Sequence, residues 1–304
     1  MQKPVRIALR ILVGLVGLIL LVVLVSYTVS GMRLRKRYDV AGNDVPVPTD
    51  SASVARGRVL ATLYGCTGCH TSNLGGQTMI AGFPFAQLAS TNITTGQGSA
   101  VADYTIADWD RAVRHGVRKD GTPLFIMPSD AFNRMNDEEF GRLVAYLKSV
   151  PPVDKTPVRR VIYPLARVIH TFGAPLVPAE KIDHATQRNP QPPRGTSIAY
   201  GDYIALSCKF CHGEDLGGRE VGGEPGAPPS PPIGRASVVA RWTQAQFFQT
   251  MRTGVTREGR KLRPQYMPWP EIGQLGDDEL RALHMYLKQG VTQSASANHR
   301  TAGE

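Results

Sequence analysis

The chain has 304 residues, a formal net charge of +10 and an apolar fraction of 42%. This length corresponds to two globular domains or one large one, so a single small domain is excluded. The apolar fraction excludes wholesale disorder, although 31 glycines and 23 prolines predict that loops take up much of the chain.

The positive charge is confined to two segments. Residues 1–40 carry seven basic side chains and one acidic one, and residues 151–200 carry seven and three. Residues 41–150 carry nine and ten, and residues 201–304 carry twelve and eleven, so the two large segments are nearly neutral. A nucleic-acid-binding domain would be basic, and we therefore expect no nucleic acid as a partner.

The N-terminal 40 residues are expected to form a membrane anchor with basic flanks. The 22 residues between Arg10 and Arg33 carry no charge. A helix of that length is about 33 Å long, which is enough to cross the hydrocarbon layer of a bilayer. The alternative is a cleavable signal peptide, for which Thr28, Ser30 and Gly31 supply the small residues of a cleavage site. The length of the uncharged run favours the uncleaved anchor.

All four cysteines lie in two copies of the motif C-x-x-C-H, at residues 66–70 and 208–212. Two cysteines three residues apart share one helical turn, where both reach the vinyl groups of one porphyrin, and the adjacent histidine can ligate its iron. A disulfide redox pair or a four-cysteine zinc site would not require the histidine in both copies. We therefore expect two covalently bound haem c groups. The expected thioether attachment points are Cys66, Cys69, Cys208 and Cys211.

The sequence around the two motifs is repeated. Each motif is followed at the same distance by Leu-Gly-Gly, at residues 74–76 and 216–218. A Met-Pro pair comes later in both halves. Each half then ends with a helical pattern that begins with three acidic residues and contains a tyrosine 19 positions after the methionine. The repetition predicts two homologous units with one haem each.

Helical periodicity is predicted for residues 55–64, 106–116 and 137–147, and again for residues 198–207, 243–254 and 277–287. No alternating run is long enough to require a sheet, so we expect each unit to be all-α, with loops around a cofactor. The large apolar faces of a haem would supplement a small core.

Met127 and Met267, which begin the two Met-Pro pairs, are the expected second axial ligands opposite His70 and His212. An iron with both axial positions filled has no place for substrate, and it transfers single electrons without bond chemistry. Four histidines without a counterpart in the other half are expected to be ordinary polar residues. These are His115, His170, His184 and His284.

The second ring nitrogen of each axial histidine is expected to donate to a backbone carbonyl, which would fix the orientation of the ring. The prolines near each motif suggest the position of this carbonyl. We expect it near Pro84 in the first unit, and at Pro231 or Pro232 in the second.

These motifs, with Ser90–Thr94, resemble those of membrane-associated multi-haem c-type cytochromes of the bacterial periplasm. The chain is most similar to the cytochrome c subunits of alcohol, gluconate and related membrane dehydrogenases, over about residues 50–290. The resemblance implies two class I cytochrome c folds in tandem, with axial pairs His70/Met127 and His212/Met267. It also implies electron delivery towards quinone or a terminal oxidase. Those subunits usually carry three haem units, whereas this chain has two and an N-terminal anchor.

The expected organisation is an anchor at residues 1–40, a first cytochrome domain at 41–150, a Pro-rich linker at 151–196, a second cytochrome domain at 197–292 and a tail at 293–304. Because this family joins haem to protein outside the cytoplasm, we expect both haem domains in the periplasm, held by a single span in the inner membrane.

The expected function is an electron relay, and no enzyme activity of its own. The electrons would come from a dehydrogenase or quinol-oxidising donor and pass to a downstream acceptor or oxidase. The alternative is a dihaem redox enzyme of the peroxidase or thiosulfate dehydrogenase type, which would need an open iron position or a nucleophilic cysteine.

Overall fold

The computed structural model describes residues 2–173, 176–185, 192, 194–220 and 228–289. The tail expected at residues 293–304 lies outside these ranges. The chain divides into two compact units, one of residues 1–61 and 65–188 and the other of residues 62–64 and 189–304.

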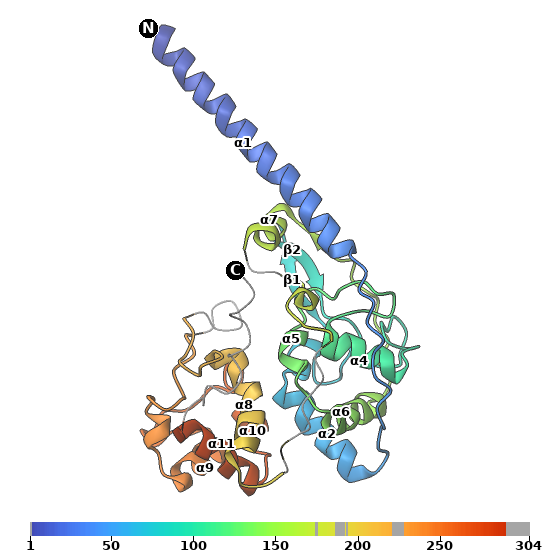
Figure 1. Cartoon of the computed structure of the whole chain (residues 1–304), viewed down its shortest axis with the longest axis vertical. Helices are drawn as coiled ribbons and strands as arrows, with labels where there is room; N and C mark the ends of the chain where they lie inside the picture. The colour runs from blue at the N-terminus through green and yellow to red at the C-terminus, as the bar shows by residue number, and fades with distance from the viewer. Residues whose placement is uncertain (1, 174–175, 186–191, 193, 221–227, 290–304) are drawn as a thin grey trace, which may run out of the picture. The chain divides into compact units, whose positions relative to one another are not determined.

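The N-terminal helix α1 (Gln2–Arg35) is 34 residues long, and most of its apolar side chains are exposed (Figure 1). Residues Pro4–Arg35 are long and apolar enough to cross a membrane, a character that an anchor shares with an N-terminal signal sequence. The C-terminal part of α1 packs against α7 (Pro164–Phe172), where Ser26 and Ser30 are buried.

The segment between α1 and α2 (Ser51–Leu63) is held on the first unit rather than free. The Tyr38 N–H donates to the Gly121 carbonyl over 2.9 Å, and the Asn43 N–H donates to a carboxylate oxygen of Asp110 over 2.8 Å. Val40 is buried in a hydrophobic cluster of the unit. The chain is therefore bound to the first unit along this segment.

The helices of the first unit follow the predicted pattern. Helix α4 begins at Thr105, whose hydroxyl accepts from the Asp108 N–H while the Asp108 carboxylate accepts from the Thr105 N–H. It ends at Gly116, whose φ of 67° is the left-handed conformation that glycine adopts most easily. The helices of this unit after α2 are α3 (Cys66–His70), α4 (Ile106–His115), α5 (Ser129–Phe132) and α6 (Asp137–Ser149).

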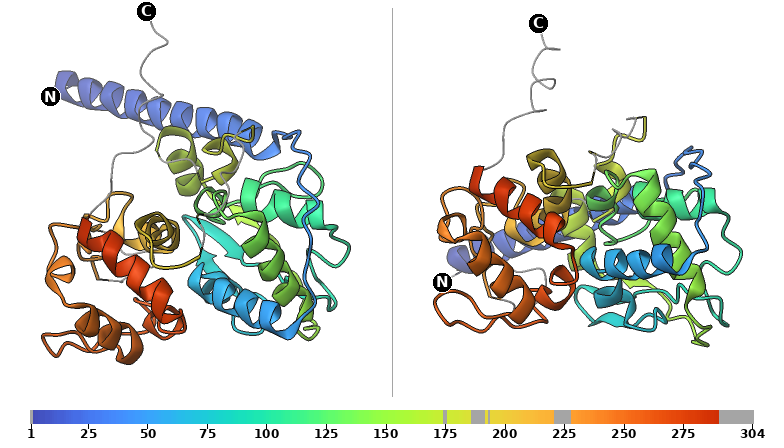
Figure 2. Two further views of the ribbon diagram at one scale, coloured as in Figure 1. Left: turned by 60° about the horizontal axis from the view of Figure 1, so that its bottom comes forward. Right: turned by 90° about the horizontal axis from the view of Figure 1, so that it is seen from below.

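Helices α2 and α6 cross in close contact at Gly57 (Figure 2). A Cβ atom at this position would lie 2.0 Å from the carbonyl oxygen of Arg142, so only glycine fits. The guanidinium of Arg56 also bonds the buried carboxylate of Glu139 on α6 over 2.7 Å. Both contacts fix the helix that leads into the first cysteine motif.

The first unit also contains a small antiparallel sheet, in the order β1–β2–β3. Its strands are β1 (Thr78–Gly82), β2 (Ala86–Ala89) and β3 (Val161–Ile162). The expectation of an all-α unit is therefore too strict, and the chain is mostly helical. The strands have five, four and two residues, so none shows an alternation that can be read from sequence.

Most of the Pro-rich segment expected as a linker has defined structure in the first unit. It forms β3, α7 and the 3-10 helix Pro178–Glu180. Val177 and Ala179 are buried in the same hydrophobic cluster as Ala86, Leu88 and Phe125. The segment therefore supplies part of the core, while residues 186–191 and 193 lie outside the described ranges.

The second unit consists of helices and loops in the residues that the structure describes. Its two longest helices, α8 and α11, pack together, and α8 carries the second cysteine motif at its end (Figure 2). Its elements are α8 (Ile198–His212), the 3-10 helix Val239–Arg241, α9 (Gln244–Thr253), α10 (Trp269–Ile272) and α11 (Asp277–Gln289).

The second unit repeats local devices of the first. Helix α9 has a capping box at Thr243 and ends at Gly254, with a φ of 70°. Helices α8 and α11 cross at Gly201, where a Cβ atom would lie 2.1 Å from the Ala282 carbonyl oxygen. The Tyr200 hydroxyl on α8 bonds Glu279 on α11, as Arg56 bonds Glu139 in the first unit. The repeated sequence thus has repeated local structure.

Candidate functional site

The first cysteine motif occupies α3, a helix of five residues that starts after Gly65. Gly65 has a φ of 73° and separates α3 from α2. Ser207 stands at the matching position of the second motif, and there the helix continues unbroken. Gly57 precedes Cys66 by nine residues, whereas Gly201 precedes its cysteine by seven, and the break at Gly65 accommodates the difference.

Side chains from the following loop hold α3 in place. The hydroxyl of Ser90 donates to the Cys69 carbonyl over 2.6 Å, and the Gln77 amide donates to the Gly68 carbonyl over 2.8 Å. These bonds satisfy carbonyl groups that a short helix leaves without intrahelical partners. The motif is therefore held from the outside rather than by its own helix.

His70, the last residue of α3, has a fixed tautomer. Its Nδ1–H donates to the carbonyl oxygen of Thr91 over 2.8 Å, which leaves the lone pair on Nε2. Burial lowers the pKa of His70, although the Thr91 bond opposes this, so the ring is neutral at pH 7. A neutral imidazole with this orientation is suited to bind a metal through Nε2. The prediction of an acceptor near Pro84 is wrong.

His212, at the end of α8, has the same arrangement. Its Nδ1–H donates to the Pro231 carbonyl over 2.7 Å, as expected. Burial lowers its pKa as well, with an opposing effect of the Pro231 bond. The acceptor lies 19 residues after His212, and Thr91 lies 21 residues after His70. Counting from the histidine, rather than searching for proline, would have placed the acceptor in the first unit within two residues of Thr91.

The loop that brings each carbonyl to its histidine is the same in both units. Leu74 and Leu216 are fully buried, and both have a φ of 58°. The carbonyl of His70 accepts from the Gly76 N–H, and that of His212 accepts from the Gly218 N–H, both over 2.8 Å. The repeated Leu-Gly-Gly triplet therefore forms a turn under the histidine, with the leucine as its anchor.

The cysteine thiols are not built for redox chemistry of their own. Burial raises the pKa of Cys66 to about 12 and that of Cys208 to about 11, with a further increase from the neighbouring cysteine in each motif. A reactive dithiol needs a lowered pKa, because the thiolate is the nucleophile. The raised pKa therefore makes the first thiol of each motif, Cys66 and Cys208, a poor nucleophile.

Met127 and Met267 occupy equivalent loop positions. Each is half-buried and lies two residues before the start of a short helix, α5 or α10. The Met127 carbonyl accepts from the Ser129 N–H over 2.8 Å, and the Met267 carbonyl accepts from the Trp269 N–H over 2.7 Å. Each methionine lies in the same unit as its expected histidine. Their role as ligands stays a prediction.

In each unit an arginine outside the cysteine and methionine motifs connects two helices, α4 with α6 and α9 with α11. Arg114 on α4 is fully buried, and it bonds Asp110 on the same helix and Asp137 at the start of α6, the latter over 2.6 Å. Arg252 stands at the matching position and bonds Asp277 over 2.7 Å. The arginine and its aspartate partner occur at matching positions in both halves of the sequence, and this repetition could have identified the pair.

The four histidines expected to be ordinary polar residues bond to protein groups in the structure. His115 and His184 face each other, with 3.0 Å between their Nδ1 atoms. His170 Nδ1 accepts from the Leu176 N–H over 3.1 Å, and His284 Nε2 donates to the Trp242 carbonyl over 3.1 Å. None of these positions recurs in the other unit, as expected for polar residues with individual structural roles.

The donors present in each unit fit a covalently bound haem. Two cysteines lie on one helical turn, and the next residue is a histidine whose Nδ1 is already engaged. These are the groups that thioether attachment and axial ligation require. Residues 54–151 match the cytochrome c family. The chain contains a cytochrome c domain.

The chain is similar to subunits of several bacterial dehydrogenases. It is 29% identical to the fructose dehydrogenase cytochrome subunit of Gluconobacter japonicus, over 85% of this chain and 57% of that protein. It is 36% identical to the alcohol dehydrogenase (quinone) cytochrome c subunit of Gluconacetobacter polyoxogenes, over 54% of this chain and 36% of that protein. It is 38% identical to the gluconate 2-dehydrogenase cytochrome c subunit of Pantoea cypripedii, over 34% of this chain and 25% of that protein.

These findings confirm the resemblance to cytochrome c subunits of bacterial membrane dehydrogenases. By their names, these relatives are cytochrome subunits of dehydrogenases. The chain spans little more than half the length of the fructose dehydrogenase subunit, and less of the other two.

Proposed function

We propose that the chain is a membrane-anchored dihaem cytochrome c that relays single electrons. In this proposal each unit is a cytochrome c domain, and the two domains stand in tandem after α1. The observation that carries the proposal is the arrangement of His70 and His212, each beside two cysteines and each donating Nδ1–H to a backbone carbonyl. Its occurrence in both units supports two haems.

Each haem would be attached by the two cysteines of its motif and ligated by a histidine and a methionine. When bound, haem iron supplies reversible one-electron chemistry, and a thioether ligand raises its reduction potential. The protein's contribution is to keep each histidine neutral and correctly turned. The proposed axial pairs are His70 with Met127, and His212 with Met267.

The anchor is supported by the contacts at the end of α1. Arg167 on α7 donates to the Ser30 hydroxyl over 2.9 Å, and Arg33 donates to the His170 carbonyl over 2.6 Å. A cleaved signal peptide would be lost from the folded protein, whereas this helix end is part of the packing of the first unit. The retained helix supplies a single span in the inner membrane. Because the family that the chain resembles joins haem to protein outside the cytoplasm, we place the N-terminus in the cytoplasm and the haem units in the periplasm.

The proposed redox partners are inferred from the names of the relatives. Their names are those of cytochrome subunits of fructose, alcohol and gluconate dehydrogenases. We propose that the chain accepts electrons from a membrane or periplasmic dehydrogenase, or from a quinol-oxidising donor, and passes them to a downstream acceptor or oxidase.

The test is the axial ligation. Visible spectra of the haem-loaded protein should show two haems per chain, the Met–Fe(III) charge-transfer band in the oxidised form, and no change when carbon monoxide is added to the reduced form. Met127→Ala and Met267→Ala should each lower one midpoint potential and let carbon monoxide bind one haem. Met79→Ala and Met285→Ala are matched controls, one in each unit, and should leave the spectra unchanged.

An open iron in the unaltered protein would contradict the proposal. Carbon monoxide would then shift the spectrum of one haem before any methionine is replaced. That result would favour the dihaem redox enzyme, which needs a free coordination position.

A further inference from the structure

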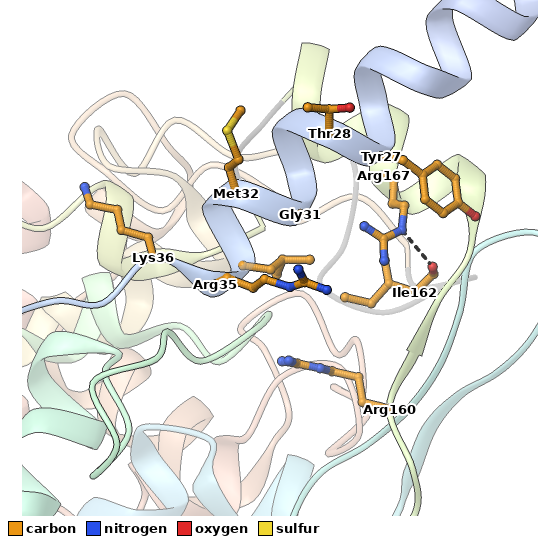
Figure 3. A pocket seen from close by; sticks show the side chains of 10 residues that line it. Tyr27, Thr28, Gly31, Met32, Arg35, Lys36, Arg160, Ile162 and Arg167 are labelled. Carbon is orange, nitrogen blue, oxygen red and sulfur yellow. Dashed lines mark hydrogen bonds between the residues drawn. The ribbon is translucent and has the colours of Figure 1, made fainter.

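A cavity of about 680 Å³ lies between the end of α1, the residues around β3 and helix α7 (Figure 3). Ten residues line it. Four of them are basic and none is acidic. We name this cavity the basic cleft, and its four cations are Arg35, Lys36, Arg160 and Arg167.

The positive charge of the basic cleft is not neutralised by protein carboxylates. In the parts of the chain that the structure describes, ion pairs join Arg33 to Glu180, but none involves the four cations of the cleft. Partial burial lowers the pKa of Arg160, and the nearby guanidinium of Arg118 lowers it further. Cations gathered in this way repel one another, so an anion bound among them would stabilise the site.

Arg167 has a fixed position in the cleft. Its guanidinium lies 4.4 Å from the ring centroid of Tyr27 and donates to the Ser30 hydroxyl and, over 3.2 Å, to the Ile162 carbonyl (Figure 3). These contacts use protein groups without charge. The arginine is therefore held in place while its charge stays available to a ligand.

The basic cleft lies where the apolar part of α1 ends. The uncharged run stops at Met32, one turn before Arg35. On α7, Leu165 and Phe172 are 44% and 62% exposed, which gives this helix an apolar surface beside the span. In a membrane-spanning α1 this level corresponds to the headgroup region, where lipid phosphates lie.

We propose that the basic cleft binds the phosphate of an anionic phospholipid, whose acyl chains lie along the exposed apolar surface of α1. This inference rests on the proposed retention of α1 as a membrane anchor. Cationic side chains facing the headgroup layer attract anionic lipids, with an effect of about 1 kcal/mol for each charge. The inference also gives a role to Arg35 and Lys36, which follow the span on the proposed periplasmic side, where the positive-inside rule does not require them.

The test uses the full-length, haem-loaded protein in neutral detergent micelles. Phosphatidylglycerol is titrated in, and native mass spectrometry counts the lipids bound to each chain. Phosphatidylcholine serves as the neutral lipid and inorganic phosphate as the soluble competitor. The variant Arg35→Gln/Arg160→Gln removes two charges of the cleft, while Arg159→Gln removes one charge from an exposed neighbour outside it.

We expect one phosphatidylglycerol to bind tightly to the unaltered protein and to Arg159→Gln. The double variant should bind it about 25-fold more weakly, because each charge contributes about fivefold. Phosphatidylcholine should not occupy the site at the same concentration. Haem spectra of the variants should be unchanged, which shows that they have folded.

Three results would overturn the inference. Equal binding to all variants would exclude the cleft, and equal weakening by Arg159→Gln would show a diffuse attraction to charge. Displacement of the lipid by an equal concentration of inorganic phosphate would indicate a site for soluble anions. The intact mass separates this inference from the proposed function. A chain without α1 refutes the anchor and the lipid site together, whereas a complete chain without bound lipid refutes only the lipid site.

Discussion

Replacement of Gly201 by alanine tests the packing of the second unit. Gly201 lies on α8, at the point where that helix crosses α11. A Cβ atom there would lie 2.1 Å from the Ala282 carbonyl oxygen and 2.8 Å from Cβ of Tyr286. The first of these atoms belongs to the backbone of α11, so no change of side-chain rotamer can make room.

Two effects of opposite sign determine the magnitude. Alanine is favoured over glycine inside a helix by about 1 kcal/mol. Ordinary van der Waals contact begins at 3.4 Å, so the helices must separate by about 1.3 Å at the crossing. Overpacking of a tight core typically costs about 1–3 kcal/mol, and more where a backbone has to move. Because this contact is with backbone, we expect a net loss of about 2 kcal/mol.

Differential scanning calorimetry of the full-length, haem-loaded protein measures this loss. For a unit of about 100 residues, 2 kcal/mol corresponds to a decrease in unfolding temperature of about 10 °C. Limited proteolysis during heating identifies the unit that opens. Gly57→Ala should destabilise the first unit in the same way, because its Cβ would lie 2.0 Å from the Arg142 carbonyl oxygen.

Gly68→Ala is the matched control, since it is also a helical glycine and a Cβ atom there would meet nothing within 4 Å. It should leave the unfolding temperature unchanged or slightly raised. If Gly201→Ala proves as stable as the unaltered protein, α8 and α11 do not cross as the structure has them. The inference that both units share this crossing would then fail.

Three further predictions concern the two units separately. Arg114→Met should destabilise the first unit by about 3–5 kcal/mol, because it removes the guanidinium that pairs with the buried Asp110 carboxylate. Arg252→Met, at an exposed ion pair, should destabilise the second unit by less than about 1 kcal/mol. Chemical denaturation compares the free energies of unfolding of the two variants. Thr243→Ala removes the N-cap of α9 and should destabilise the second unit by about 1 kcal/mol, and an unchanged unfolding temperature would contradict the capping box. Burial lowers the pKa of His284, so below about pH 6.5 the unfolded chain binds a proton that the native state does not, and stability falls as the pH decreases. His284→Gln should remove part of this decline, up to about 1.4 kcal/mol per pH unit. The free energy of unfolding measured as a function of pH tests this.

The helices of the repeat could be predicted because their signals are local. Thr105 and Gly116 mark the two ends of α4 in the sequence, and the structure places the capping box and the left-handed residue there. The predicted helix at residues 55–64 is present as α2, although it begins at Ser51. Residues three or four positions apart determine these features, so a single sequence contains them.

The sheet and the acceptor of His70 could not be predicted, because both depend on distant parts of the chain. Strand β3 pairs Ile162 with Ala86, and two residues show no periodicity. Thr91 reaches His70 only after the β1–β2 hairpin has brought the chain back. In the second unit the acceptor is a proline, which stands out in the sequence, whereas a threonine carbonyl at a similar interval does not.

The docking of α1 on α7 determines how the first unit can meet other proteins. Together with the bound segment around Tyr38 and Val40, this docking fixes the helix on the first unit, so that no flexible linker separates them. In the proposed membrane-anchored protein, a redox partner in the same bilayer would find the first unit by lateral diffusion, at a constant height and with one face turned towards it. A fixed height raises the effective concentration of the first unit for partners whose docking surface lies at the same height. It disfavours complexes with partners whose docking surface lies elsewhere.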